Sequence, residues 1–222
     1  MIIAIGQNVA NLLEQMSKLS TYVIVAAVAV HLFVFFVLWV WAGRDLRQIA
    51  ATLFDFTRGL KNQSLLDSTA HLSDQIEAFL ADVTDVLDDP GRGADRQNLI
   101  QRMRIIDERR RYLNSMLFDT VYNVARSMIE AYPLAGILGT VLAIGAALQS
   151  SGASVATIVS RFGESIWATF AGLFSAILLM FINSFLETGF VRLAENRRQV
   201  RETVARVKRE LSLSVASAEG TK

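Results

Sequence analysis

Two threonines and one glutamate carry the polar groups best placed for chemistry in this sequence. Thr140 lies in the middle of residues 131–148, and Thr169 lies in the first part of residues 165–186. Neither apolar segment contains a Lys, Arg, Asp or Glu, and Glu164 stands directly before the second one. Polar side chains inside membrane helices are energetically costly and mark functional positions. These three residues are therefore the candidates for an ion pathway.

Small residues occur at helical spacing around both threonines. Glycine and alanine allow a neighbouring helix to approach closely, so these faces are expected to pack in a pore. A threonine hydroxyl in a membrane helix also bonds to the carbonyl oxygen four residues earlier, which would explain either threonine alone. Two hydroxyls on small-residue faces of adjoining segments instead indicate a pore lining. The packing candidates are Pro133, Gly136, Gly139, Ala143, Ala168, Gly172 and Ala176.

Glu164 has two interpretations that the sequence leaves open. At the start of a helix, its carboxylate would be favoured by the helix dipole and would be near Arg161 as an ion-pair partner. At the mouth of an ion pathway, the same carboxylate would concentrate protons or Na⁺.

His31 and Asn183 are two further polar residues within apolar segments. His31 lies midway along residues 21–42, and we expect it to be neutral and hydrogen-bonded to a neighbouring helix. A proton relay through His31 would require polar partners in its own segment, and no such partner is visible there. Asn183 is expected to form a structural hydrogen bond between helices.

The elements that position these residues must be membrane helices. Of the 222 residues, 52% are hydrophobic and 19% are charged, whereas roughly a quarter of the residues in a soluble domain are charged. Residues 21–42, 131–148 and 165–186 are each about long enough to cross a hydrocarbon core of roughly 30 Å. The sequence therefore predicts an all-α membrane protein with three transmembrane helices and excludes a soluble enzyme.

Other functional classes lack the residues that they need. The chain has no cysteine and only two histidines, which excludes disulfides and thiol catalysis and leaves little for a metal site. It contains no phosphate-binding loop, zinc-protease motif, nucleophile elbow or dinucleotide fingerprint. A formal net charge of +1 gives no basis for nucleic-acid binding. We therefore expect no catalytic activity, no cofactor and no nucleic-acid partner.

The distribution of Lys and Arg predicts the orientation of the spans. Residues 43–130 contain twelve and residues 187–222 contain eight, whereas residues 1–20 and 149–164 contain one each. Because positive charge accumulates on the cytoplasmic side, the N-terminus is predicted to lie outside and the C-terminus inside. The expected organisation is an outer amphipathic helix, a cytoplasmic helical loop, an outer hairpin and a cytoplasmic helical tail.

The cytoplasmic parts are also expected to be helical. Apolar residues recur at a spacing of three or four along residues 46–60, 72–86 and 193–211. Residues 88–93, with the sequence DDPGRG, predict a helix end followed by a turn. A helix is then expected to restart near Asp95 and to continue without interruption into the second span.

Two motifs on either side of the predicted outer hairpin resemble those of a known family. PLAGILGTVLAIGAAL at 133–148 and FGESIWATFAGLFSA at 162–176 are similar to the second and third spans of the MotA/TolQ/ExbB proton-channel family. The three-span topology resembles the TolQ/ExbB branch most closely, since MotA has four spans. The motif residues matched here include Pro133, Gly136, Gly139, Thr140, Glu164, Ala168, Thr169 and Gly172.

The resemblance implies a stator-type subunit of an ion-driven motor in the bacterial inner membrane. Its members form a homopentamer around a single-span subunit that resembles TolR, ExbD or MotB and carries one membrane-embedded Asp. Protons, with Na⁺ as the alternative, would pass from Glu164 to that Asp and then past Thr140 and Thr169. Neutralising the Asp would let the ring of subunits step around its partner.

Two other functions remain open from the sequence. The same motor could drive gliding or anti-phage defence in place of envelope energisation or protein transport. Alternatively, the chain could be a non-conducting membrane scaffold in which Thr140 and Thr169 only pack between helices. A scaffold has no need of a partner with a membrane-embedded Asp.

Overall fold

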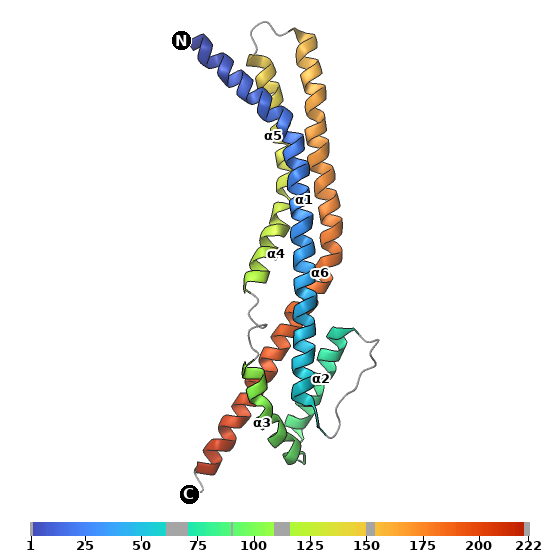
Figure 1. Cartoon of the computed structure of the whole chain (residues 1–222), viewed down its shortest axis with the longest axis vertical. Helices are drawn as coiled ribbons and strands as arrows, with labels where there is room; N and C mark the ends of the chain where they lie inside the picture. The colour runs from blue at the N-terminus through green and yellow to red at the C-terminus, as the bar shows by residue number, and fades with distance from the viewer. Residues whose placement is uncertain (1, 61–70, 90, 109–115, 150–153, 220–222) are drawn as a thin grey trace. The chain divides into compact units, whose positions relative to one another are not determined.

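The computed structural model describes residues 2–60, 71–89, 91–108, 116–149 and 154–219, and within these ranges it contains helices and no strand (Figure 1). Helix formation by apolar segments is expected in a membrane, where every backbone N–H and C=O group must be paired internally. The helices are α1 (Ile2–Thr57), α2 (Leu72–Asp88), α3 (Gly93–Glu108), α4 (Met116–Met128), α5 (Ala131–Gln149) and α6 (Val155–Glu219).

Three helical stretches of the described chain are long and apolar enough to cross a membrane. They lie within Leu19–Thr57, Met116–Leu148 and Ile158–Glu210. The prediction of an all-α protein with three transmembrane helices is therefore confirmed. Helices α1 and α6 continue well past the predicted ends of their spans, so helix boundaries do not mark the edges of the membrane.

A tight turn at Ile129 and Glu130 separates α4 from α5. The Ile129 carbonyl oxygen accepts a hydrogen bond from the Tyr132 N–H at 3.3 Å, three residues later. Pro133, the residue that would make the regular helical bond to this carbonyl, has no N–H to donate. The sequence predicted an uninterrupted helix from near Asp95 into the second span. Residues 109–115 of that stretch lie outside the described residues, and further on the structure has α4, this turn and α5.

The described helices divide into two compact units. One contains Met1–Leu38 and Phe118–Leu186, and the other contains Trp39–Leu117 and Glu187–Lys222. All three predicted spans contribute most of their length to the first unit. The residues that were predicted to form the ion pathway also belong to the first unit.

The second unit has an apolar core made by the predicted stripes. Its helices bury residues at a spacing of three or four, which places them on one face of each helix. The predicted break is also present, because α2 ends at Asp88 and α3 begins at Gly93. The most buried members of the stripes are Ile49, Leu53 and Phe56 on α1, Ile76, Val83 and Val86 on α2, and Leu193, Val200 and Val207 on α6.

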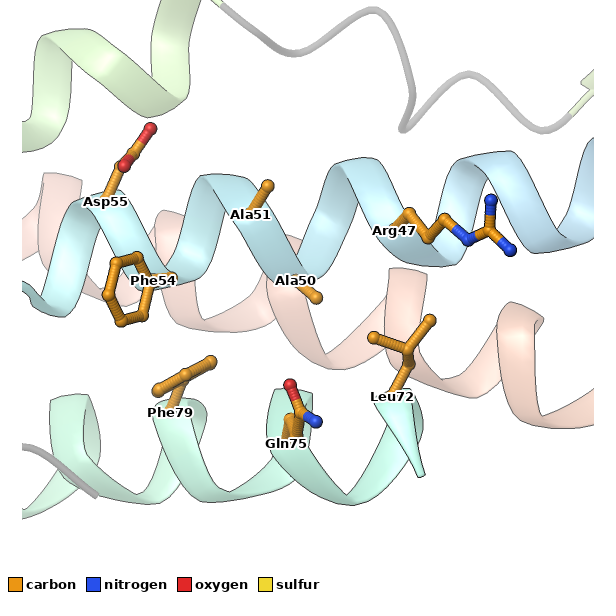
Figure 2. Close-up of a pocket in the computed structure, with 8 residues that line it drawn as sticks. All are labelled: Arg47, Ala50, Ala51, Phe54, Asp55, Leu72, Gln75 and Phe79. Carbon is orange, nitrogen blue, oxygen red and sulfur yellow. The ribbon is translucent and has the colours of Figure 1, made fainter. Parts of the chain in front are cut away.

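An open cavity of about 310 Å³ lies between α1 and α2 in this second unit (Figure 2). The Phe54 and Phe79 rings meet edge to face at one end of it, with their centroids 6.1 Å apart. None of the predicted pathway residues lines the cavity. Its lining consists of Arg47, Ala50, Ala51, Phe54, Asp55, Leu72, Gln75 and Phe79.

Two ion pairs connect helices of the second unit. Arg197 on α6 pairs with Asp45 on α1, and the Arg197 side chain is 1% exposed. Arg206 on α6 pairs with Asp88 at the end of α2, where both side chains are exposed. The buried pair therefore joins α1 to α6 next to an apolar core, whereas the second pair lies at the surface.

The buried pair gives a prediction about stability. Asp45→Ala leaves the Arg197 guanidinium buried without its carboxylate, and breaking a buried pair in this way costs about 3–5 kcal/mol. We expect thermal unfolding of the purified protein in detergent to show this loss. Asp45→Leu combined with Arg197→Met should restore most of the stability, because no charge then remains buried.

Arg206→Ala is the matched control, since an exposed pair contributes about 0–1 kcal/mol. An Asp45→Ala protein as stable as the Arg206→Ala protein would contradict the role given to the buried pair.

Candidate functional site

Thr140 on α5 and Thr169 on α6 lie against each other in the first unit, and we call them the threonine pair. Their Oγ1 atoms are 2.6 Å apart. Thr140 Oγ1 also lies 3.1 Å from the Ser165 carbonyl oxygen and 3.4 Å from that of Gly136, and Thr169 Oγ1 lies 3.1 Å from the Gly136 carbonyl oxygen. The hydroxyls therefore bridge two helices in addition to the weak contact that Thr140 makes within its own helix. Both side chains are half-buried.

The hydroxyl hydrogens of the pair are both used inside the site. Each hydroxyl has one hydrogen and two lone pairs, and a separation of 2.6 Å requires a hydrogen between the oxygens. In one arrangement, the Thr140 hydroxyl donates to the Ser165 carbonyl oxygen and the Thr169 hydroxyl donates to Thr140 Oγ1. In the other, the Thr169 hydroxyl donates to the Gly136 carbonyl oxygen and the Thr140 hydroxyl donates to Thr169 Oγ1. In either arrangement one hydroxyl oxygen keeps both lone pairs open, the other keeps one, and neither hydrogen is free. The pair is thus an acceptor of hydrogen bonds.

Two glycines allow this contact by bringing the helix backbones together. A methyl group at Gly136 would lie 2.8 Å from the Ala168 carbonyl oxygen and 2.9 Å from Thr169 Cα, which is too close for carbon. A methyl group at Gly172 would collide with the Tyr132 carbonyl oxygen and lie 3.2 Å from Gly136 Cα. Only glycine fits this crossing of α5 and α6, as in other closely packed membrane helices.

Helix α1 approaches the same region from another side. A methyl group at Gly139 would lie 2.9 Å from Ser20 Oγ on α1 and 3.2 Å from Ala168 Cβ on α6. Three helices therefore meet within the turn that precedes Thr140. The other predicted packing residues also lie in this unit, with Ala143, Ala168 and Ala176 buried and Pro133 half-buried.

His31 forms the hydrogen bond to a neighbouring helix that was expected of it. Its Nδ1 lies 3.3 Å from the Tyr132 hydroxyl on α5, and both side chains are buried. Asn183 is buried on α6, and its Oδ1 has no hydrogen-bond partner among the described residues. Tyr132 was not predicted as a site residue. A tyrosine in an apolar segment nevertheless indicates a hydroxyl that needs a hydrogen-bond partner when it is buried.

Glu164 is not connected to this site by the structure. Its backbone belongs to α6, but its side chain lies outside the part of the chain whose side chains the structure describes. The choice between a helix cap and a cation-gathering carboxylate is therefore still a prediction.

Residues 91–199 match the model of the MotA/TolQ/ExbB proton channel family. This region of the chain belongs to the family. The matched region contains α5, the threonine pair and both glycines of the α5–α6 crossing. No curated protein and no solved structure matches the chain. The match to this proton channel family supports an ion-conducting role in a membrane.

The glycine crossing gives a second prediction. Gly136→Ala and Gly172→Ala each place a methyl group against a backbone carbonyl, and overpacking of this kind costs about 1–3 kcal/mol. We expect both variants to unfold at lower temperature in detergent than the parent chain. Gly145→Ala is the matched control on α5, because no other atom lies within 4 Å of its methyl position. Equal stability of all three variants would show that α5 and α6 do not cross at these glycines.

Proposed function

We propose that this chain is the pore-forming, stator-type subunit of an ion-driven motor in the bacterial inner membrane. The observation that carries the proposal is the threonine pair, a half-buried polar contact between two segments without charged residues, 131–148 and 165–186, inside the region matched by the family model. Polar side chains inside membrane helices mark functional positions. The three-span fold favours a role like that of the TolQ/ExbB branch.

The charge that moves through the pore must come from another subunit. Residues 131–148 and 165–186 contain no acidic or basic side chain, so the chain's own pore-forming spans hold no proton carrier. A single-span partner resembling TolR, ExbD or MotB, with one membrane-embedded Asp, would supply it. Each proton crossing a potential of 100 mV releases about 2.3 kcal/mol, so a few protons suffice for a mechanical step.

The threonine pair would act on the protonated form of the partner's carboxyl group. A protonated acid has a hydrogen to donate, and the pair has open oxygen lone pairs to accept it. An ionised carboxylate needs a donor, and both hydroxyl hydrogens are already used within the site. The pair would therefore hold the neutral acid while it passes through the apolar pore. Open lone pairs could equally face Na⁺, which is the alternative ion.

We propose that five copies of the chain surround the partner, as the family resemblance implies. The outward faces of α5 and α6 are apolar and suit contact with neighbouring copies or lipid. Exposed residues on these faces include Leu134, Leu138 and Val141 on α5, and Trp167, Phe170 and Phe174 on α6.

A non-conducting scaffold is the second candidate, because one observation favours it. The two hydroxyls satisfy each other and nearby carbonyls within a single chain, which is what simple helix packing also requires. Gliding and anti-phage defence are different uses of the same motor and would share the site.

Replacing the hydroxyls distinguishes a pore from a scaffold. Thr140→Val or Thr169→Val removes one of the two hydroxyl acceptors, while the remaining threonine still donates to a carbonyl oxygen. We therefore expect ion-driven flux to fall in part, by about tenfold. Thr140→Val combined with Thr169→Val removes every hydroxyl acceptor of the pair and should abolish flux, whereas serine at either position should preserve much of it. The measurement is dye-detected proton uptake by vesicles that contain the chain with its copurifying single-span subunit.

Ser175→Ala is the matched control, since it removes a buried hydroxyl of α6 outside the pair. Full flux in the double valine variant, with normal assembly, would favour the scaffold.

Glu164 gives a separate prediction about entry into the pore. If its carboxylate gathers cations, Glu164→Gln should reduce proton uptake in the same vesicles without changing assembly. Glu202→Gln, which neutralises an exposed carboxylate of α6 in the second unit, is the control. A Glu164→Gln protein that keeps its flux but loses about 0.5–1 kcal/mol of stability would identify a helix cap instead.

A further inference from the structure

We propose that His31 is a positioning residue for the threonine pair, because its hydrogen bond ties to α1 the residue of α5, Tyr132, whose backbone lies against α6. Neither residue belongs to the polar pathway assigned above. The importance of this position for ion flow rests on the proposed function, whereas the position itself is a property of the fold and is measured separately.

Tyr132 contacts two different helices with two different groups. Its hydroxyl lies 3.3 Å from His31 Nδ1 on α1, and the two rings are 5.8 Å apart. Its backbone carbonyl lies against Gly172 on α6, in the space that a methyl group would otherwise occupy. Tyr132 is therefore held by α1 through its side chain and meets α6 through its backbone.

The position of Tyr132 determines the position of Thr140, because both residues belong to α5. Gly136 follows one turn later, and its carbonyl oxygen is 3.1 Å from Thr169 Oγ1. Thr140 follows after one more turn. Because an α-helix has a fixed rise per residue, a shift of Tyr132 along α6 moves Thr140 by the same amount. A shift of about 1 Å would break a 2.6 Å hydrogen bond between the hydroxyls.

The chemistry of His31 favours a role in position over a role in stability. Its side chain is 5% exposed and packs edge to face on Phe35, and Nε2 has no hydrogen-bond partner among the described residues. A buried polar atom without a partner lowers stability, so apolar residues in place of both His31 and Tyr132 would hold α1 and α5 together at least as well. A single buried polar contact, in contrast, selects one register between helices that apolar side chains leave less defined.

Cysteine crosslinking measures this position without reference to ion flow. The chain has no cysteine, so Thr140→Cys combined with Thr169→Cys introduces the only two thiols. The sulfur atoms would replace hydroxyl oxygens that are 2.6 Å apart, close to the disulfide length of about 2.05 Å. A membrane-permeable oxidant forms the disulfide. Its formation is measured as the loss of the two thiols that a high-mass maleimide would otherwise label.

We expect His31→Phe and Tyr132→Phe to slow disulfide formation at least about tenfold in this background, since small misplacements have large effects on rate. His31→Asn should restore the parent rate, because its amide can bond to the Tyr132 hydroxyl where the imidazole did. Ile24→Ala is the control, since it alters buried packing on α1 two turns away from His31 and removes no hydrogen bond.

Parent rates in both His31→Phe and Tyr132→Phe would overturn the positioning role. Tyr132→Phe removes a single oxygen and keeps the ring, so it decides the question if His31→Phe does not fold. A slowed rate in Ile24→Ala as large as in His31→Phe would also overturn it, by showing that any packing change on α1 has the same effect. If the valine variants lose ion flux while His31→Phe and Tyr132→Phe keep the parent crosslinking rate, the proposed function holds and His31 does not have this role.

Discussion

The backbone contact at Gly136 and Gly172 is the constraint on which the rest of the site depends. Side chains of ordinary size would keep α5 and α6 apart, and the hydroxyls of Thr140 and Thr169 would then face apolar surroundings separately. With glycine at both positions, the two hydroxyls come within 2.6 Å of each other and reach carbonyl oxygens of the opposite helix. The polar contact between α5 and α6 therefore depends on the two glycines as much as on the two threonines.

This arrangement limits what the site can do chemically. Because both hydroxyl hydrogens are used within the pair and its carbonyls, the site offers oxygen lone pairs and no free donor. It suits a protonated acid or a cation and is poorly suited to an ionised carboxylate. Residues 131–148 and 165–186 contain no charged side chain. An ion-driven role would therefore require a second subunit. Under the proposed function, a partner subunit would bring the group that changes charge.

The sequence predicted most of the fold because hydrophobic length and periodicity are local properties. Three apolar stretches, the helix end at Asp88 and the stripes of the second unit all follow from residue order, and the family follows from two motifs. The turn between α4 and α5 was missed, although Pro133 lies three residues into α5 and cannot supply the bond that the Ile129 carbonyl would need in a continuous helix.

The candidate site was predictable in its residues and not in its contacts. Thr140 and Thr169 stood out as polar groups on small-residue faces, but spacing along one helix cannot show which hydroxyl meets which carbonyl on another. For the same reason Tyr132 was missed, since its partner His31 is 101 positions away in the chain. Asp45 and Arg197 pair across a still longer separation and could not be linked from sequence alone.

Whether the threonine pair faces a water-containing path is the central claim, and thiol labelling in native membranes tests it most directly. Thr140→Cys and Thr169→Cys are made singly in the cysteine-free chain, with Phe181→Cys on the exposed apolar surface of α6 as reference. All three thiols should react with an uncharged, membrane-soluble maleimide, which shows that they are present. A small positively charged methanethiosulfonate should modify the cysteines at 140 and 169 and leave the cysteine at 181 unmodified. Failure of the charged reagent to reach 140 and 169 would contradict the account, because the threonines would then lie in a dry contact between helices.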